Sequence, residues 1–186
     1  MVDTGVIHGR FQVLHIDHVV YLLAGKERCR HLVVGITNPD PVLTAEDAAD
    51  PDRSLPEANP LSYFERQVMV RDVLRESGVA LEAFSIVPFP VNFPHLYRCY
   101  VPSDATFFIT VYDEWGRRKQ ARFQELGLRV ELLWERPPDQ KGISAADVRD
   151  RMAAGLPWEH LVPAATARLM AAWDIPARLR RLRARG

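Results

Sequence analysis

The sequence predicts an α/β fold in which a doubly wound, Rossmann-like parallel sheet of about five strands carries a helical C-terminal extension. Short, nearly continuous apolar runs typical of buried parallel strands alternate with longer segments of helical periodicity. The 186 residues, 47% of them hydrophobic and 26% charged, can bury one substantial core. A single α/β domain with a small appendage therefore fits the chain.

The expected elements follow one another in the order that a parallel sheet requires. The strands are expected at residues 6–8, 31–36, 84–87, 106–111 and 129–133. The helices are expected at 17–27, 62–77, near Leu96, at 116–126, 144–154 and 164–173, and after Pro176. Ser62 and Glu65 have the spacing of a capping box at the start of the second long helix.

Two stretches lie outside this alternation. Residues 37–60 form a long loop rich in proline, aspartate, glutamate and alanine, and loops of that length are lids, binding loops or disordered segments. We interpret this loop as an expansion of the rim of a ligand site. Residues 1–163 are expected to form the main domain, with 164–186 as a helical extension packed on it.

The charge balance and the cysteine content exclude several functional classes. Lysine plus arginine equals aspartate plus glutamate at 24 each, so no net field attracts nucleic acid or a membrane. The basic segment 178–185 is either an RNA or anionic-surface patch or a solvated last helical turn; the absence of interleaved aromatic residues favours the second. Two cysteines without metal spacing, no apolar span and no signal sequence indicate a cytoplasmic protein.

The loop after the first predicted strand carries groups suited to phosphate chemistry. Gly9 allows the backbone to come close to a phosphate, and the planar guanidinium of Arg10 can donate hydrogen bonds to phosphate oxygens. His15 and His18 lie three residues apart on one face of a helix start, where they can donate hydrogen bonds to an α-phosphate whose charge grows during in-line attack. Two surface histidines without a role, or two zinc ligands lacking a third, are the alternatives.

A second loop of this kind follows the fifth predicted strand. Ser144 is a natural N-cap for the next helix. The helix N–H groups, the Ser144 hydroxyl, Lys141 and Arg149 together could hold β- and γ-phosphates. A capped helix with an exposed arginine is the plainer alternative. Two basic loops at carboxyl ends of strands in one small domain favour a phosphate site.

Four segments together resemble the archaeal-type nicotinamide-nucleotide (NMN) adenylyltransferases of the cytidylyltransferase-like HxGH superfamily, which has the HUP-type Rossmann-like fold. Residues 9–18 resemble G-R-F-Q-P-x-H-x-G-H, and residues 59–66 resemble N-P-F-T-x-x-E-R. Residues 143–149 resemble I-S-G-T-x-I-R, and residues 151–163 resemble R-M-x-x-G-x-x-W-E-x-L-V-P. The resemblance implies an enzyme of NAD biosynthesis: the phosphate of a mononucleotide attacks the α-phosphate of ATP, Mg²⁺ bridges the triphosphate, and pyrophosphate leaves.

The resemblance also implies roles for particular residues. The implied catalytic residues are His15, His18 and Arg10. The implied nucleotide-binding residues are Gly9, Phe11, Gln12, Asp17, Lys141, Ile143, Ser144 and Arg149. Trp158 belongs to a helix-packing segment and is expected to fill the core, and no side chain is assigned to the metal itself.

Three departures from the family pattern cluster around the base and acceptor pockets. Asp17 replaces glycine, either contacting a ribose hydroxyl or changing base choice, or serving only as a first-turn acid favoured by the helix dipole. Ala145 and Ala146 replace glycine and threonine. The bulkier segment 112–119 replaces a Ser-Gly-Asn turn and suggests an altered acceptor pocket. The expected acceptor-binding residues are Asp113, Trp115, Arg117, Lys119, Asn92 and Phe93, whose alternatives are a solvated helix start and core packing.

The sequence thus predicts a nucleotidyltransferase with small-molecule substrates. The leading hypothesis is adenylyl transfer to NMN. The alternative is a related transferase that uses CTP or ATP with a different phosphate or phosphonate acceptor. A nucleotide sensor or RNA-binding module and a fragment resembling aminoacyl-tRNA synthetases rank lower. No membrane partner is expected, nucleic acid is disfavoured, and the oligomers of the archaeal-type family leave a homo-oligomer open.

Overall fold

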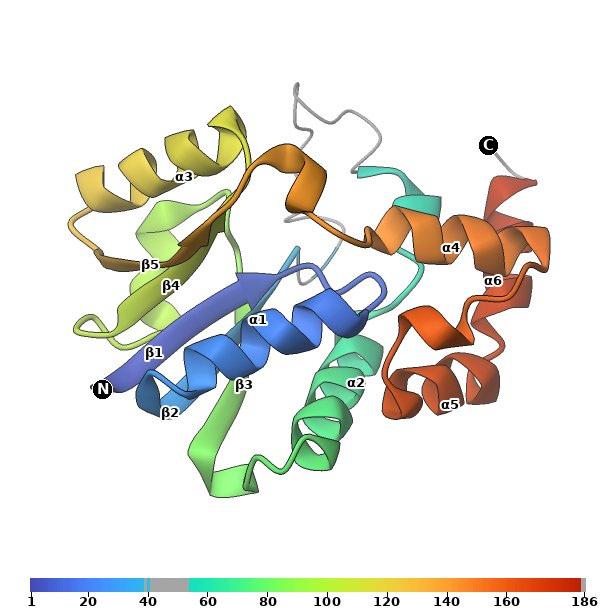
Figure 1. Ribbon diagram of the computed structural model, residues 1–186, viewed down its shortest axis with the longest axis horizontal. Coiled ribbons are helices and arrows are strands. Elements are labelled where there is room, and N and C mark those ends of the chain that lie inside the picture. Colours follow the sequence, from blue (N-terminus) through green and yellow to red (C-terminus); the bar gives the residue numbers. More distant parts are fainter. Residues whose placement is uncertain (39, 41–53, 185–186) are drawn as a thin grey trace.

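The computed structural model describes residues 1–38, 40 and 54–184 and shows a five-stranded parallel sheet (Figure 1). The strand order is β3-β2-β1-β4-β5, and every neighbouring pair is parallel. The strands are β1 (Val2–Gly9), β2 (Cys29–Thr37), β3 (Phe84–Phe89), β4 (Thr106–Val111) and β5 (Arg129–Glu135). The strand order reverses between β1 and β4, which is where open α/β sheets bind ligands.

Six α-helices accompany these strands in the described part of the chain. They are α1 (Ile16–Lys26), α2 (Tyr63–Glu76), α3 (Glu114–Glu125), α4 (Ala145–Ala154), α5 (Ala164–Ala172) and α6 (Ile175–Arg183). The segment near Leu96 forms a 3-10 turn, Pro94–Cys99. The predicted α/β class and the alternation of strands and helices are confirmed. None of the helices described is long and apolar enough to cross a membrane.

The side chains of alternate strand residues build two cores, one on each face of the sheet. Ile7 points to the larger core, formed with α1, α2 and the helices that follow β5. Val6 points to the smaller, aromatic-rich core, which includes Phe107 and Phe123 under α3. Trp158 is buried in the larger core, as predicted. The β1 carboxyl end is thereby fixed from both faces.

Helix α1 packs unusually close to the central strand. A β-carbon at Gly25 would lie 2.3 Å from Cδ1 of Ile7, so only glycine allows this approach. The packing fixes the axis of α1 and therefore the place of its N-terminus, which lies at the carboxyl end of β1.

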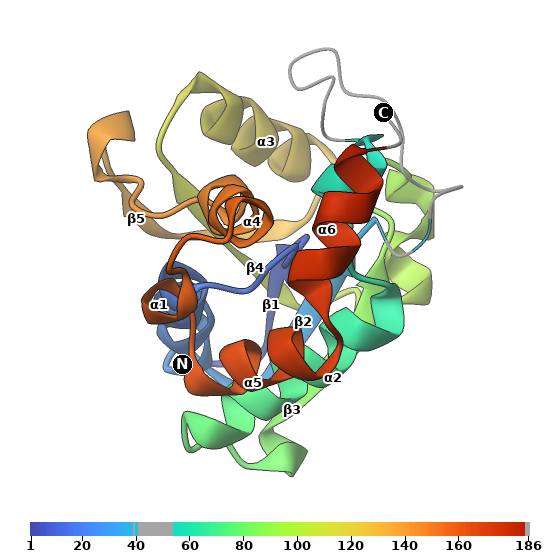
Figure 2. The same cartoon turned by 90° about the vertical axis from the view of Figure 1, so that its right-hand side faces the viewer.

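Helices α5 and α6 pack against α2 and α4 (Figure 2). The predicted capping box starts α2: Oγ of Ser62 accepts from the Glu65 N–H at 3.2 Å, and Glu65 Oε2 accepts from the Ser62 N–H at 2.8 Å. The same carboxylate receives two hydrogen bonds from Arg178 of α6, at 2.7 and 2.8 Å. A third Arg178 bond, of 2.9 Å, goes to the Pro60 carbonyl.

The basic C-terminal segment is therefore partly explained by packing. Arg178 binds Glu65, and Arg183 forms an ion pair with Asp150 of α4. Leu179 between them is fully buried. The segment is thus a last helical turn, as favoured from the sequence, but Arg178 and Arg183 are paired with carboxylates while Arg180 and Arg181 are exposed.

Candidate functional site

The N-termini of α1 and α4 meet at the carboxyl end of β1 (Figure 1). The contact that joins them is a hydrogen bond of 2.7 Å from the Ile143 N–H to Oδ2 of Asp17. Because the N-terminus of a helix carries partial positive charge and unsatisfied N–H groups, two of them together make a strong anion site. Most of the predicted phosphate-binding residues lie around this point.

His15 and His18 stack on each other within this site. Their ring centroids are 3.7 Å apart, with an angle of 28° between the ring planes. The His15 N–H donates to Nδ1 of His18 at 3.3 Å, which leaves the proton of a neutral His18 ring on Nε2. Nδ1 of His15 is buried and has no hydrogen-bond partner among the described residues.

The surroundings keep both imidazoles neutral. Burial lowers the pKa of His15 to about 4, against the opposing effects of the Asp17 and Asp147 carboxylates. Burial also lowers the pKa of His18, and the charges of His15 and Arg10 lower it further. At neutral pH both rings are therefore hydrogen-bond donors without a net charge.

Phe11 sets the position of the His18 ring. Its own ring is buried and meets the His18 ring edge-on, with centroids 5.2 Å apart. Phe11 adopts a left-handed backbone conformation with φ of 51°, which costs about 1–3 kcal/mol for a residue with a side chain. A β-carbon at Gly9 would lie 2.9 Å from the Phe11 ring, so Gly9 provides the space that the ring needs.

Gln12 has a different place from the one expected. Its side chain is buried and forms two hydrogen bonds with the main chain of Leu61, donating to the carbonyl at 2.8 Å and accepting from the N–H at 2.9 Å. In this structure the side chain joins the first loop to the start of α2, and its contact with a nucleotide stays a prediction. The amide oxygen and one N–H of the amide are used in this contact.

Arg149 joins α4 to the same loop. Its guanidinium is buried and donates to the main-chain carbonyl of Gln12. The alternative of an exposed arginine at this position is wrong. The segment that starts α1 and the segment that starts α4 are therefore joined twice: Asp17 of α1 binds the Ile143 N–H before α4, and Arg149 of α4 binds the Gln12 carbonyl before α1.

Arg66 is a buried cation for which the sequence predicts no role. It is 2% exposed and donates to the carbonyls of Arg10 at 3.1 Å, Thr37 at 2.7 Å and Asn38 at 2.7 Å. Burial lowers its pKa to about 10, and Tyr63 opposes this. The residue joins the ends of β1 and β2 to α2. Its signal in the sequence was the N-P-x-x-x-x-E-R motif.

The predicted cap of α4 is present, and it uses the Ser144 hydroxyl. Ser144 Oγ donates to Oδ2 of Asp147 at 2.7 Å and accepts from the Asp147 N–H at 3.1 Å. The Ser144 N–H donates to the same carboxylate at 3.0 Å, and hydrogen bonds from Ser144 lower the pKa of Asp147. The N–H groups of residues 143 and 144 are thus both bound to carboxylates.

Asp17 lies in the first turn of α1, as one of its two interpretations expected, and it also makes a contact that neither interpretation included. Its carboxylate bonds to the Ile143 N–H and lies against Gly142, where a β-carbon would be 2.3 Å from Oδ2. It therefore links two loops that are far apart in the sequence.

The segment after β4 lies beside this centre, because β4 is the neighbour of β1. Asp113 caps α3, accepting from the Gly116 N–H at 2.9 Å, and forms an ion pair of 3.6 Å with Lys141. Lys119 lies over the Trp115 ring, 5.0 Å from its centroid, and that ring is 39% exposed. The exposed aromatic and cationic groups expected at the acceptor side are thus close together.

The remaining predicted acceptor residues occupy other places. Arg117 forms an ion pair of 2.7 Å with Glu135 at the end of β5. Asn92 and Phe93 follow the edge strand β3, which β2 separates from β1. The expected rim loop falls partly on residues 39 and 41–53, outside the described residues.

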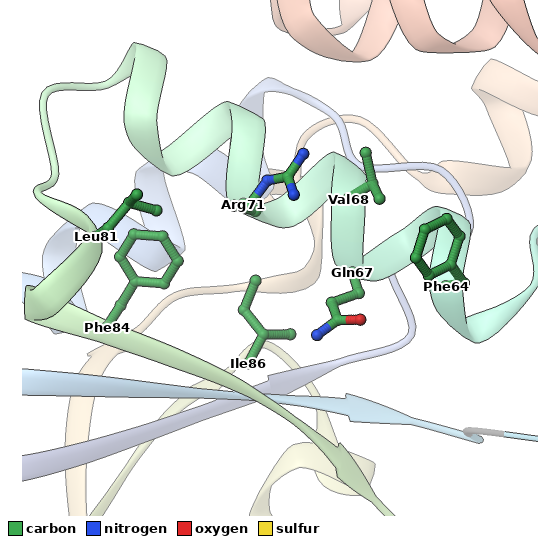
Figure 3. Close-up of a pocket in the computed structure, with 7 residues that line it drawn as sticks. All are labelled: Phe64, Gln67, Val68, Arg71, Leu81, Phe84 and Ile86. Carbon is green, nitrogen blue, oxygen red and sulfur yellow. The ribbon is translucent and has the colours of Figure 1, made fainter.

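A surface hollow of about 240 Å³ lies between α2 and the edge strand β3, away from these loops (Figure 3). Its lining residues are Phe64, Gln67, Val68, Arg71, Leu81, Phe84 and Ile86. None of them is a predicted site residue. We assign the candidate site to the meeting point of α1 and α4 instead, because the titratable and phosphate-binding groups gather there.

No group of three or more His, Cys, Asp or Glu side chains suited to a metal ion occurs among the described residues. The nearest carboxylates, Asp17 and Asp147, already accept main-chain N–H groups. These residues fit a magnesium ion that arrives with a triphosphate and takes most of its ligands from phosphate oxygens and water.

The chain is similar in sequence to known nucleotidyltransferases. It is 55% identical over 177 residues to a phosphonoformate cytidylyltransferase from Streptomyces viridochromogenes, covering 95% of each chain. It is 30% identical over 170 residues to a nicotinamide-nucleotide adenylyltransferase from Thermococcus kodakarensis, covering 90% of this chain and 81% of that one. No protein-family model matches the chain.

Solved structures show the same fold. A bifunctional NMN adenylyltransferase/ADP ribose pyrophosphatase from Francisella tularensis superposes with a TM-score of 0.66 at 16% identity. The match covers 95% of this chain and 52% of that one, so the chain spans about half of that bifunctional protein. The same protein complexed with AMP and a manganese ion superposes with a TM-score of 0.64.

Proposed function

The chain belongs to the nucleotidyltransferases of the cytidylyltransferase and NMN adenylyltransferase type, and from this premise we propose that it transfers CMP from CTP to phosphonoformate or a close phosphonate analogue. The observation that carries the proposed chemistry is the stacked, neutral His15–His18 pair at the meeting point of two helix N-termini. The 55% identity to a phosphonoformate cytidylyltransferase supports the choice of substrates.

The proposed reaction is an in-line displacement at the α-phosphorus of the triphosphate. An oxygen of the phosphonate forms the new P–O bond, while the bond from the α-phosphorus to the bridging oxygen of the β-phosphate breaks. Pyrophosphate leaves with that electron pair. Because the attacking phosphonate is already ionised at neutral pH, the step requires no general base.

The histidines act in this proposal as donors to the α-phosphate. Nε2–H of His18 is the available donor of that ring, since its Nδ1 accepts from the His15 N–H. Neutral donors stabilise the growing charge on the α-phosphate oxygens without having to release a proton. Arg10 provides a cation beside them. The Arg66 guanidinium donates a hydrogen bond to the main-chain carbonyl of Arg10 and so helps to position it.

The leaving pyrophosphate is assigned to the start of α4. Lys141, which pairs with Asp113, and the dipole of α4 favour negative charge there, while the Ile143 and Ser144 N–H groups are already bound to Asp17 and Asp147. Arg149 holds that helix against the first loop. A magnesium ion, bound through the triphosphate, would neutralise charge that develops on the leaving group.

The acceptor is assigned to the side of β4. The Lys119–Trp115 pair provides a cation and an exposed ring, and these suit a small anionic acceptor or a base that stacks. Phosphonoformate carries both a phosphonate and a carboxylate, so a cationic side chain at this edge would recognise it.

The second candidate is adenylyl transfer to NMN, the leading expectation from the sequence. Similarity to the enzymes of Thermococcus kodakarensis and related archaea favours it. The lower identity, 30% against 55%, ranks it behind the phosphonate reaction.

The test is pyrophosphate release with Mg²⁺, combining CTP or ATP with phosphonoformate or NMN. We expect release to be fastest with CTP and phosphonoformate. The His18→Ala variant should lose about 100-fold or more of this rate, while His160→Ala, which changes an exposed histidine of the turn Glu159–Leu161, should not. Release with ATP and NMN alone would favour the second candidate, and no release with any pair would reject both.

A further inference from the structure

The loop 136–144 between β5 and α4, called here the β5–α4 loop, determines where α4 begins. It leaves β5, two strands away from β1, and passes the end of β4 to reach α1 (Figure 1). Three contacts hold it: the Arg136 N–H to the Val111 carbonyl at 2.9 Å, Lys141 to Asp113, and the Ile143 N–H to Asp17. The last of these is the contact at the site itself.

The fit between Asp17 and this loop depends on two residues. Gly142 has a φ of 72°, which favours glycine, and its missing β-carbon leaves the space that Oδ2 of Asp17 occupies. The 2.7 Å bond from the Ile143 N–H is short and has a carboxylate as its acceptor, so it belongs to the stronger class of hydrogen bonds.

We propose that Asp17 is a positioning residue whose hydrogen bond to the Ile143 N–H holds the start of α4 opposite the histidine pair, in the geometry that a nucleoside triphosphate requires. The triphosphate part of this inference rests on the proposed function, whereas the bond between the loops does not. Arg149 ties α4 to the first loop through the Gln12 carbonyl. The hydrogen bond to Asp17 is a second contact, at the start of α4. Two contacts at different points along α4 restrain its rotation about its own axis as well as its position.

The hydrogen bond and the charge of Asp17 have opposite effects on the triphosphate. The bond orders the loop that receives the phosphates, while a carboxylate beside them repels their negative charge. The proposal assigns the larger effect to the bond. Asparagine at this position keeps an oxygen acceptor of the same shape and removes the charge, whereas alanine removes both.

The experiment compares Asp17→Asn and Asp17→Ala with the unchanged protein. The first measurement is hydrogen exchange of the Ile143 amide without ligands. We expect about tenfold faster exchange in Asp17→Ala and less than about threefold change in Asp17→Asn. Gly142→Ala should resemble Asp17→Ala, since its β-carbon displaces the carboxylate. Glu114→Ala, which removes an acidic residue from the first turn of α3, serves as the matched control and should leave the exchange unchanged.

The second measurement is calorimetric titration with CTP and Mg²⁺, followed by KM and kcat for CTP. Asp17→Ala should raise Kd and KM about tenfold with kcat changed far less, and Asp17→Asn should restore binding to within about threefold. Unchanged Ile143 exchange in Asp17→Ala, or tighter CTP binding in both variants, would overturn the inference. Failure of the unchanged protein to bind any triphosphate would instead reject the proposed function, even with the exchange results as expected.

Discussion

The protein should become less stable as the pH falls from 7 to 5, because His15 takes up a proton in the unfolded chain but not in the folded one. Burial lowers the pKa of His15 in the folded state to about 4, whereas the ordinary value is 6.5. Between these values the unfolded chain binds a proton that the folded chain does not, so the free energy of unfolding decreases with falling pH. At pH 5 the unfolded imidazole is almost fully protonated, and the difference from pH 7 amounts to about 2 kcal/mol.

The assay is urea denaturation of the protein and of His15→Asn at pH 7 and pH 5. The variant lacks the titrating ring, so its loss of stability between the two pH values should be smaller by about 2 kcal/mol. His18 is present in both proteins, and its contribution, which has the same sign, largely cancels. His160→Asn controls for the loss of an exposed histidine. Equal losses in the protein and in His15→Asn would refute the argument that burial holds this ring neutral.

Three further predictions concern contacts around the site. Gln12→Ala leaves the main-chain groups of Leu61 without their buried partner, and should lower the free energy of unfolding by about 2 kcal/mol in urea denaturation. Arg178→Ala should cost about 1–2 kcal/mol in the same assay, with Arg178→Lys recovering less than half, since lysine cannot make the two-pronged bond to Glu65. Trp115→Ala should raise KM for the acceptor about tenfold and leave KM for the triphosphate nearly unchanged in the pyrophosphate assay; an equal rise in both would remove Trp115 from the acceptor side.

The features that the sequence predicts well are those set by neighbouring residues. The capping box of Ser62 and Glu65 and the cap at Ser144 depend on side chains reaching main-chain groups three residues away, so their spacing is visible in the sequence. The same holds for the strands and helices, whose ends differ from the expected ones by a few residues. The class of the fold follows from their alternation.

Long-range contacts explain what the sequence could not indicate. Asp17 and Ile143 are 126 positions apart, and Gln12 and Leu61 are 49 apart. No periodicity relates such pairs, so Asp17 stayed open between a nucleotide contact and a first-turn acid, and Gln12 was grouped with the nucleotide ligands around it. The strand order, which places β4 and not β3 beside β1, instead agrees with the doubly wound, Rossmann-like sheet that the sequence predicts.

The close fit of Asp17 against Gly142 also limits the order in which substitutions can accumulate. A β-carbon at residue 142 would displace the Asp17 carboxylate from the place that it has in this structure, whereas a glycine at 142 is tolerated with or without aspartate at 17. If glycine appears first at position 142, aspartate can follow at position 17 without a clash. If aspartate appears first, its carboxylate clashes with the β-carbon of residue 142 in this geometry. A transplant of the loop carrying Asp17 into a related enzyme would therefore also need glycine at position 142, whereas the loop carrying Gly142 could be moved by itself, a one-sided epistasis between distant sites in the sequence.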